Sequence, residues 1–478
     1  MFEIPKLKKF IFPIIGTLTI FQYSLQQSMP IHTLDQYVKS SKNPKQATET
    51  LILQNGIYIF GCVLGTELYK LLANQSSKFI FLLSDVIYFL GNCTLILLYF
   101  QSTNSEDNTQ EESEKIQLQP IEIYLILRVF VGIANGLNYA QSIIYVKQMS
   151  SKKESQFFFK LIPLQLLIGQ CLGAYWLESD QQNTPDIITF LNIILILNFV
   201  SVLRMILLQF LQIETPQYYL KILKDQRRSK MIYQEIHNDN IQTYFGFEQE
   251  TLRNNLNQSA SEYLISKPYL KKYFKCCLLI VLTQFTGETL IFSFLYTPLH
   301  KYCDSQKENN GCQIYWIYAF ITGFLMILLQ MIFYNFIKRK KIITLIGQAI
   351  ICIALAFLGF SVGLKDKSWQ LVLLQFGYSL GIGTQIFSII PYQLPEFGIL
   401  YCINIQWIIG LVEMCFYGLF LNKLPSSDSL EQIHAIQELI QIYFFVSCVG
   451  LILIFIILRQ PIRTQPQQKI KKEEKKSI

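Results

Sequence analysis

Long stretches without a charged residue restrict this chain to a membrane fold. Residues 309–337 and residues 342–364 contain no Asp, Glu, Lys or Arg. A helix needs about 20 consecutive apolar residues to cross a bilayer, and both stretches are long enough. In a soluble domain, a helix of this kind would have no polar face to turn toward water. The pattern therefore predicts a polytopic membrane protein.

The composition agrees with this prediction. Only 15% of the 478 residues are charged and 51% are hydrophobic, whereas soluble domains carry about 25% charged residues. So little polar surface excludes a cytosolic enzyme and a nucleic-acid binder, although the net charge is +8. The sequence contains no G-x-x-x-x-G-K-[ST] motif for nucleotides, and its four histidines show no zinc spacing. We therefore expect neither enzymatic activity nor a cofactor.

Uncharged runs, some of them interrupted, indicate twelve spans in two groups of six. The first group covers about residues 10–28, 51–72, 79–100, 122–146, 157–177 and 187–208, and the second about 274–298, 313–337, 342–364, 369–391, 400–421 and 439–458. The prediction is an all-α membrane protein with twelve transmembrane helices in two six-helix bundles and an intracellular helical linker. Its expected parts are an N-terminal bundle (1–208), a linker with short amphipathic helices such as 216–238 (209–270), a C-terminal bundle (271–458) and a basic cytoplasmic tail (459–478).

Basic residues predict which side each loop faces, because Lys and Arg concentrate in cytoplasmic loops. With both termini and the linker inside, the inner segments hold roughly three basic residues for each one in the outer loops. The loop at 101–120 is acidic and falls outside. We therefore expect the linker and both termini in the cytoplasm.

Several motifs occur in order along this layout. Span four reads L-R-V-F-V-G-I-A-N-G, with Arg128, Gly132 and Gly136; span six is followed by I-E-T-P-Q-Y-Y-L; and span seven contains L-T-Q-F-T-G-E-T. In these segments the chain resembles the sugar-porter family of the major facilitator superfamily. The resemblance implies two bundles of parallel repeats around a site at mid-membrane.

The resemblance also implies which side chains bind the solute. Amides both donate and accept hydrogen bonds, as recognition of hydroxyl groups requires, and aromatic rings stack on sugar faces. The family's glutamine in span five falls on Pro163 here, so Gln165 and Gln170 are alternative replacements. The predicted binding residues are Thr283, Gln284, Thr289, Gln165, Gln170, Tyr392 and Trp407. Each amide could instead bond a neighbouring helix, and each aromatic could be an interfacial anchor.

Five charged residues within the spans are functional candidates, because such residues are costly in a bilayer: Glu67, Asp85, Arg128, Glu288 and Glu413. Glu67, Asp85 and Glu413 are expected near helix ends. Arg128, at a family position, is expected to hold its helix to a neighbour. Glu288 is predicted as a proton-coupling site or an ion-pair partner, because residues 10–34 of span one contain no acid.

The family's D-R-x-G-R-[RK] gating motifs are degenerate here, which leaves two functions open. The first is a secondary active or facilitative transporter of a small polar solute, a hexose or a related sugar, that works by alternating access with a proton as candidate co-substrate. The alternative is a non-transporting member of the fold that serves as a receptor or a structural subunit. In either case we expect an integral protein surrounded by lipid, in the plasma membrane or an endomembrane.

Two cysteines flank a short polar loop that the topology places outside. Cys303 and Cys312 could form a disulfide there, because oxidising compartments permit such bonds, or they could remain free thiols.

Overall fold

The structure is a computed structural model that describes residues 4–27, 44–106, 118–150, 154–179, 187–211, 214–237, 267–287, 311–333, 340–360, 368–421 and 429–459. Within these ranges, every regular element is a helix. The first half supplies α1 (Ile4–Thr17), α3 (Pro44–Leu72), α4 (Ser77–Glu106), α6 (Leu118–Met149), α7 (Ser155–Phe158), α8 (Leu161–Ser179) and α9 (Ile187–Phe210). The segment after α9 holds α10 (Pro216–Lys221) and α11 (Gln226–His237). The second half supplies α14 (Lys267–Gln284), α17 (Gly311–Ile332), α18 (Lys340–Phe360), α19 (Ser368–Leu380), α20 (Ile382–Gln393), α21 (Glu396–Leu421) and α22 (Ser429–Arg459).

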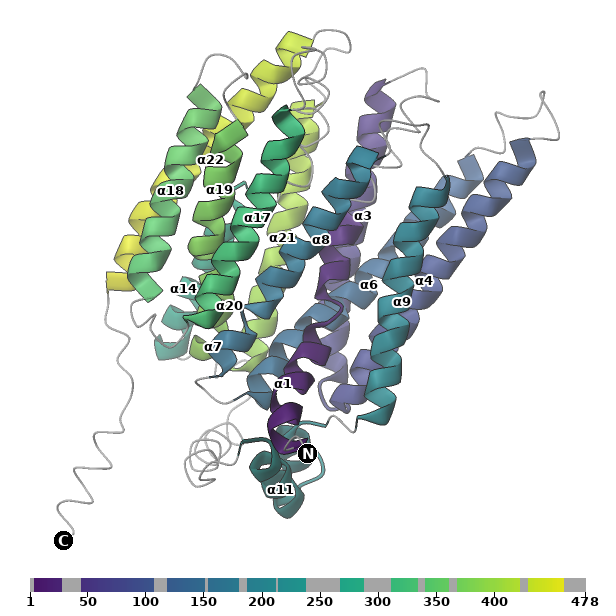
Figure 1. Cartoon of the computed structure of the whole chain (residues 1–478), viewed down its shortest axis with the longest axis vertical. Coiled ribbons are helices and arrows are strands. Elements are labelled where there is room, and N and C mark those ends of the chain that lie inside the picture. Colours follow the sequence, from purple (N-terminus) through teal and green to yellow (C-terminus); the bar gives the residue numbers. More distant parts are fainter. Residues whose placement is uncertain are drawn as a thin grey trace.

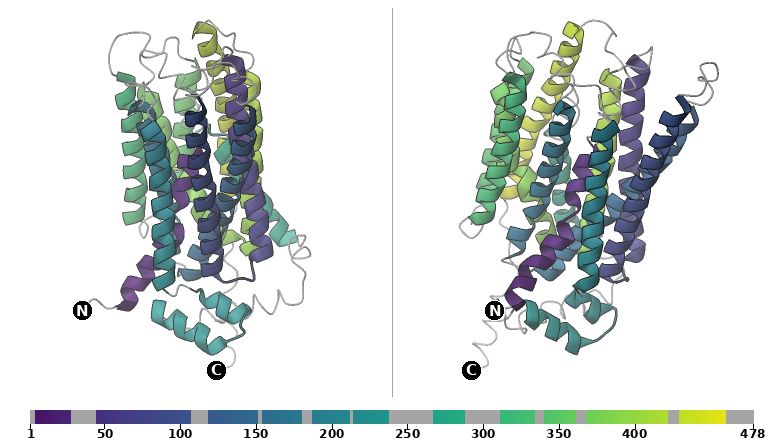
Figure 2. Two further views of the ribbon diagram at one scale, coloured as in Figure 1. Left: turned by 90° about the vertical axis from the view of Figure 1, so that its right-hand side faces the viewer. Right: turned by 45° about the vertical axis from the view of Figure 1, so that its right-hand side comes forward.

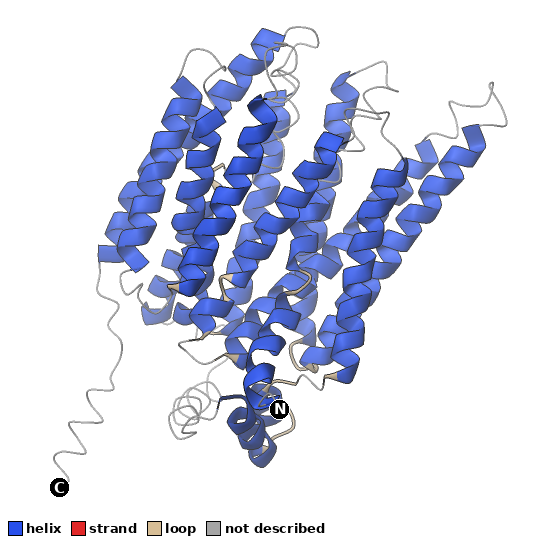
Figure 3. Cartoon of the chain, in the orientation of Figure 1, coloured by secondary structure: helices blue, strands red, loops and turns tan. Residues whose placement is uncertain are grey.

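The long helices run side by side as two groups that meet along the middle of the molecule (Figure 1). α3 packs on α21 and α8 packs on α17, so these helices join the halves. α11 lies beyond one end of the bundle, which we call the linker end (Figure 2). Figure 3 shows helices and loops but no strand among the residues that the structure describes. A cavity between the two groups would therefore be walled by both halves.

Six helical segments among the described residues are long and apolar enough to cross a membrane, namely Ile123–Met149, Ser155–Gly173, Lys341–Phe360, Trp369–Gln393, Glu396–Phe416 and Gln437–Ile457. Outward-facing side chains of the bundle are apolar: Phe199 on α9 is 66% exposed and Phe445 on α22 is 60% exposed. Such surfaces suit a lipid solvent and would be unstable in water.

Small residues bring α3 and α6 into backbone contact. A Cβ on Gly136 would collide with the carbonyl oxygen of Cys62, and one on Gly132 would collide with that of Tyr58. Helices in a bilayer gain their association from such close packing, because lipid tails provide no hydrophobic drive between them. The G-x-x-x-G spacing of span four is therefore a packing surface.

Replacing Gly136 by Ala should lower the free energy of unfolding by about 1–3 kcal/mol, because the added methyl group forces the two backbones apart. Gly56 on α3 is the matched control, since nothing lies within 4 Å of the Cβ position there. Gly56→Ala should leave stability unchanged or slightly raised. Titration with a denaturing detergent in mixed micelles measures both, and equal stabilities of the two variants would contradict the packing role.

Every predicted span contains a helix, but several predicted elements are interrupted where the sequence suggested continuity. The fifth span is divided at residues 159–160 between α7 and α8, and the tenth at Gly381 between α19 and α20. The predicted helix at 216–238 is two helices, because Lys224 adopts the left-handed conformation with φ of 54°. Asp225 then caps α11 by accepting a hydrogen bond from Arg228 N at 2.9 Å.

The E-T-P segment after α9 is built from helix caps. Glu214 caps α4 by accepting hydrogen bonds from the backbone nitrogens of Ser77, at 3.1 Å, and Lys78, at 3.3 Å. Thr215 caps α10 by accepting one from Tyr218 N at 3.2 Å, and Pro216 occupies the first turn. Burial raises the pKa of the Glu214 carboxyl against the opposing effect of these backbone donors. The motif thus ties the linker to the base of α4.

Candidate functional site

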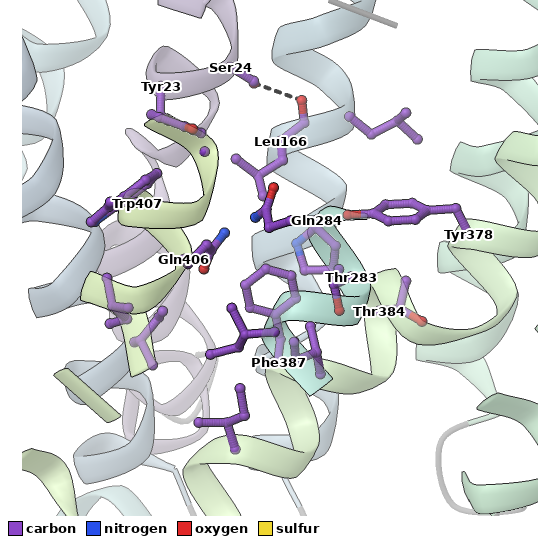
Figure 4. A pocket seen from close by; sticks show the side chains of 18 of the residues that line it. Tyr23, Ser24, Leu166, Thr283, Gln284, Tyr378, Thr384, Phe387, Gln406 and Trp407 are labelled. Atoms are coloured by element: carbon purple, nitrogen blue, oxygen red, sulfur yellow. Dashed lines mark hydrogen bonds between the residues drawn. The ribbon is translucent and has the colours of Figure 1, made fainter. Parts of the chain in front are cut away.

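A cavity lies between the two halves and is walled by both (Figure 4). It contains about 1190 Å³ of unoccupied space, its part that is open to solvent included. Its polar lining residues are Tyr23, Ser24, Gln27, Gln170, Thr283, Gln284, Gln375, Tyr378, Ser379, Thr384, Gln406 and Glu413.

Two spans that line this cavity are interrupted: the first about one turn before its cavity residue Tyr23, and the seventh directly after its cavity residue Gln284. The helix of span one is interrupted at residues 18–19, where Thr17 Oγ1 donates to Pro13 O at 3.1 Å. α14 ends at Gln284 and is followed by Gly287, whose φ of 70° favours glycine. A Cβ at Gly287 would also meet the Tyr443 ring at 3.1 Å. Breaks of this kind in membrane helices are tolerated where the backbone lines a cavity.

Five glutamines line the cavity, and three of them, Gln170, Gln284 and Gln406, have amides with few hydrogen bonds among the described residues. Gln284 of α14 points toward the space between Leu166 and Gln406 in Figure 4. Among the described residues, the amides of Gln284 and Gln170 make no hydrogen bond. Gln406 accepts only a long bond from the Tyr139 hydroxyl, at 3.5 Å. These amides come from both halves and keep donors and acceptors available to a solute.

Aromatic rings close one side of the cavity around Trp407. This side chain is 1% exposed, and its Nε1 donates to Thr66 Oγ1 of α3 at 3.1 Å. Its ring lies 4.9 Å from that of Tyr23 and 5.1 Å from that of Tyr139. Trp407 therefore links α21 to three helices of the first half.

Four of the residues predicted to bind solute line the cavity: Thr283, Gln284, Gln170 and Trp407. Thr283 Oγ1 already donates to Leu279 O at 2.8 Å, so it is left mainly as an acceptor. Of the two alternatives in span five, Gln165 faces away and donates through Nε2 to Thr17 Oγ1 at 3.0 Å. That the cavity residues bind a solute stays a prediction.

Tyr392 does not face the cavity, contrary to the expectation from its motif. Its hydroxyl accepts a hydrogen bond from Ser155 Oγ at 3.3 Å, at the linker end. The preceding Pro391 lines the cavity, and each residue of a helix is rotated about 100° from the last, so Tyr392 points elsewhere.

Four further candidates lie wholly or partly outside the described residues. Glu288, Thr289 and Cys303 fall in the range 288–310. Cys312 belongs to the first turn of α17, and its side chain is outside the description. The proposed disulfide and the role of Glu288 therefore remain predictions.

Arg128 of α6 contacts two other helices of the first half, span one and α3. Its Nη1 donates to Gln26 Oε1 at 2.6 Å and its Nη2 to Gln26 O at 3.1 Å, while its guanidinium lies 4.7 Å from the centre of the Tyr58 ring. Its partners among the described residues are an amide and a ring, so no ion pair is seen there. Arg128 also lies outside the cavity wall.

Asp85 and Arg204 form a buried ion pair that the sequence did not indicate. Arg204 Nη2 lies 2.6 Å from Asp85 Oδ1, and Nε donates to Oδ2 at 2.8 Å. Nη1 also donates to Asn138 Oδ1 at 2.6 Å. Asp85 was expected near a helix end, but it lies about two turns inside α4 and is 1% exposed. The sequence signal that could have indicated this pair is that two spans carry one residue each of opposite charge, Asp85 and Arg204.

Several cavity residues were missed by sequence reasoning. Gln375, Tyr378 and Ser379 share one face of α19 at helical spacing, and Tyr23, Ser24 and Gln27 share one face of span one. Polar residues three and four positions apart in an otherwise apolar span would have identified both faces.

Contacts between the halves close the linker end. Lys147 Nζ donates to Leu394 O at 2.7 Å, and Gln148 Nε2 donates to Glu396 Oε1 at 3.0 Å. Nearer the cavity, the buried Lys160 donates to Gln330 Oε1 at 2.5 Å. All three hydrogen bonds run from the first half to the second.

The degenerate gating segment of span two also connects the halves. Lys70 Nζ lies 2.6 Å from Glu67 Oε1 and 4.0 Å from the centre of the Tyr401 ring. Glu67 accepts a hydrogen bond from Asn404 Nδ2 of α21. Residues other than the family's motif thus hold α3 against α21.

Comparison with known structures identifies the fold. The chain is similar to the major facilitator superfamily proton:xylose symporter XylE bound to 6-bromo-6-deoxy-D-glucose, with 13% identity and a TM-score of 0.75, covering 95% of this chain and 96% of that one. It is also similar to the inward-open xylose transporter XylE from E. coli, with 12% identity and a TM-score of 0.64, covering 96% and 98%. No curated protein matches the chain significantly.

The expected fold class, an all-helical membrane protein of the major facilitator type, is confirmed by these structures. The profile of a family described as "Sugar (and other) transporter" matches residues 13–464, nearly the whole chain. The chain therefore belongs to the sugar (and other) transporter family, as a multi-pass membrane protein with the major facilitator fold.

Proposed function

We propose that this chain carries a small, uncharged, polyhydroxylated solute, a pentose, hexose or related polyol, across a membrane by alternating access. The observation that carries the proposal is the set of amides from both halves that face one cavity with unused hydrogen-bonding groups. Hydroxyl groups need donors and acceptors together, which amides supply. The titles of two similar structures name xylose and a deoxy-glucose, which supports this solute class.

The contacts at the linker end support a transport cycle rather than a fixed assembly. They are single hydrogen bonds and one partly buried ion pair, Lys221 Nζ to Glu396 Oε2 at 3.6 Å. An ion pair that keeps some contact with solvent contributes about 0–1 kcal/mol, so the two halves can separate at modest cost. At the degenerate motif of span two, which suggested a receptor or structural subunit, the contacts of Glu67 with Lys70 and Asn404 connect α3 to α21.

The direct test is counterflow of radiolabelled D-xylose and D-glucose into proteoliposomes preloaded with the unlabelled sugar. We expect saturable exchange that empty liposomes lack. Binding without exchange would support the receptor or subunit alternative, because exchange requires the cavity to open to both sides.

Replacing Gln284 by Ala should weaken solute binding by about 1–3 kcal/mol, roughly 5- to 150-fold, because a solute hydroxyl loses its buried partner. Gln165→Ala is the matched control, since Gln165 is the same residue type but bonds Thr17 instead of facing the cavity. Titration of counterflow with sugar concentration measures both affinities. Equal affinities for the two variants would remove Gln284 from the site.

The topology is also a proposal: the linker end faces the cytoplasm, and the two bundles and the linker keep the predicted boundaries. α11 and the last turn of α4 lie at opposite ends of the bundle (Figure 1). Single cysteines at Ser105 and at the exposed Arg227 of α11, in a variant without the native cysteines, should react with an impermeant thiol reagent outside intact cells only at position 105. Labelling at position 227 alone would invert the topology.

A further inference from the structure

Two cysteines of the second half meet where α14 packs on α21. The Sγ atoms of Cys277, on α14, and Cys402, on α21, lie 4.0 Å apart and share a hydrogen bond. Both are free thiols; Cys277 is partly exposed and Cys402 is 1% exposed. They stand 125 positions apart in the sequence. The contact is therefore a product of the fold that no local spacing of cysteines indicated.

The thiol pair lies between the linker end and the amides proposed to hold the solute. Glu396, the first residue of α21, takes part in the contacts at the linker end. Cys402 follows it by less than two turns and precedes Gln406 by about one turn. Cys277 precedes Gln284 by about two turns of α14, so these two side chains share a face of that helix. A covalent bond between the thiols would thus join the helices that carry both amides.

One of the two thiols borders the cavity. Among the cavity-lining residues that the structure describes, Cys402 is the one thiol and Glu413 the one carboxyl group. Glu413 was expected near a helix end, but it lies about two turns before the end of α21 and is 3% exposed. Cys352 of α18 and Cys448 of α22 also share a hydrogen bond, but neither lines the cavity. Of these two thiol pairs, the one with Cys277 is therefore the one at the cavity.

Basic and aromatic groups surround the pair. Lys272 and Lys275 of α14 act electrostatically on Cys276, the neighbour of Cys277. The Tyr273 hydroxyl is within hydrogen-bond distance of the Cys277 sulfur. Cysteines that react with oxidants are partly exposed and stand in electropositive surroundings, because the thiolate is the nucleophile. Cys277 has both properties.

We propose that Cys277 and Cys402 form a redox-sensitive pair, which a hydroperoxide converts to a disulfide that ties α14 to α21 and slows transport. A disulfide bond is about 2.05 Å long, so the two sulfurs, already in contact, approach by about a further 2 Å. Disulfides in reducing compartments are transient and redox-sensing, which suits a pair near the end of the bundle that is proposed to face the cytoplasm. The effect on transport rests on the proposed function, whereas the disulfide does not.

The oxidation by hydrogen peroxide balances in two steps. The Cys277 thiolate attacks one oxygen of the peroxide; an S–O bond forms, the O–O bond breaks, and the leaving hydroxide takes up the proton of the thiol as water. The Cys402 sulfur then attacks the sulfenic sulfur of Cys277. The S–S bond forms, the S–O bond breaks, and the hydroxyl group leaves with the Cys402 proton as a second water. The two thiols lose two electrons and the peroxide gains them; a dithiol reverses the reaction by exchange.

The effect on transport follows from the position of the bond. Span seven is interrupted directly after Gln284, so α14 is a separate helical segment that ends at the cavity. The disulfide would hold this segment to α21 and fix Gln284 relative to Gln406. Alternating access requires the cavity helices to change their contacts, and a covalent bond between two of them opposes that change.

Peptide mapping tests the disulfide without any solute. The full-length protein in proteoliposomes is treated with hydrogen peroxide, the remaining thiols are alkylated, and mass spectrometry is performed without reduction. The peptides that contain Cys277 and Cys402 should be linked. Cys276→Ser is the matched control, because this adjacent thiol donates to Gln393 Oε1 at 3.6 Å instead. The link should persist in Cys276→Ser and be lost in Cys277→Ser.

Two results of the mapping would overturn the proposal. One is alkylation of both Cys277 and Cys402 in the peroxide-treated wild type, which would make them ordinary buried thiols. The other is a link confined to Cys352 and Cys448, which would place the oxidation away from the cavity.

Counterflow of radiolabelled D-xylose and D-glucose measures the effect on transport. Peroxide should slow exchange by the wild type several-fold, and dithiothreitol should restore it. Cys277→Ser should exchange at the same rate with and without peroxide. A disulfide that forms while exchange is unchanged would overturn the control of transport. If the reduced wild type exchanges neither sugar, the proposed function fails, while the peptide map still decides whether the disulfide forms.

Discussion

Replacing Asp85 by Leu should lower the free energy of unfolding by about 3–5 kcal/mol, because it leaves the Arg204 guanidinium buried without its countercharge. Arg204 is fully buried, and two of its nitrogens contact the two carboxylate oxygens at 2.6 and 2.8 Å. The pair joins α4 to α9, and the bond to Asn138 adds α6. The loss would thus loosen three helices of the first half together.

The double replacement Asp85→Leu with Arg204→Met is the informative control. An apolar pair of similar volume removes both charges, and such exchanges are often neutral or stabilising. The double variant should therefore recover most of the stability that the single variant loses. Detergent-titrated unfolding of the purified variants measures the difference. A single variant as stable as the wild type would show that the pair contributes nothing.

Replacing Trp407 by Ala should lower the free energy of unfolding by about 3–5 kcal/mol, as expected when a fully buried tryptophan is deleted. The ring fills the space between Tyr23 and Tyr139, and its hydrogen bond to Thr66 connects the halves. Solute binding should weaken as well, because the wall of the cavity is lost.

Two control variants separate the causes of this effect. Trp407→Phe keeps most of the volume and removes only the bond to Thr66, which should cost about 0.5–1.5 kcal/mol. Trp369 on α19 is 45% exposed, so Trp369→Ala should change stability much less. Unfolding in mixed micelles and sugar affinity in counterflow give the two readouts. A Trp407→Ala variant as stable as Trp369→Ala would contradict the structural role.

The sequence predicted a cavity residue correctly only where that residue belongs to a short segment that resembles the family. Gln284 and Trp407 were identified because each belongs to a short segment that resembles the family. Tyr392 belongs to a similar segment but points to the linker end, because one residue of helical rotation separates it from the cavity. Gln165 and Gln170 could not be separated, since the contact with Thr17 that turns Gln165 away lies in another span.

The amino-acid order by itself determined the class of the molecule. Uncharged runs long enough to cross a bilayer admit only helices, because unpaired backbone groups are too costly in lipid. Their number and the basic linker then specified the architecture. Contacts between side chains of different helices depended on which helix faces meet, and no local sequence pattern specifies which faces meet. Glu413 illustrates the difference: its sequence context is one acid in an apolar run, and its place in the cavity wall follows only from the packing of α21 between both halves.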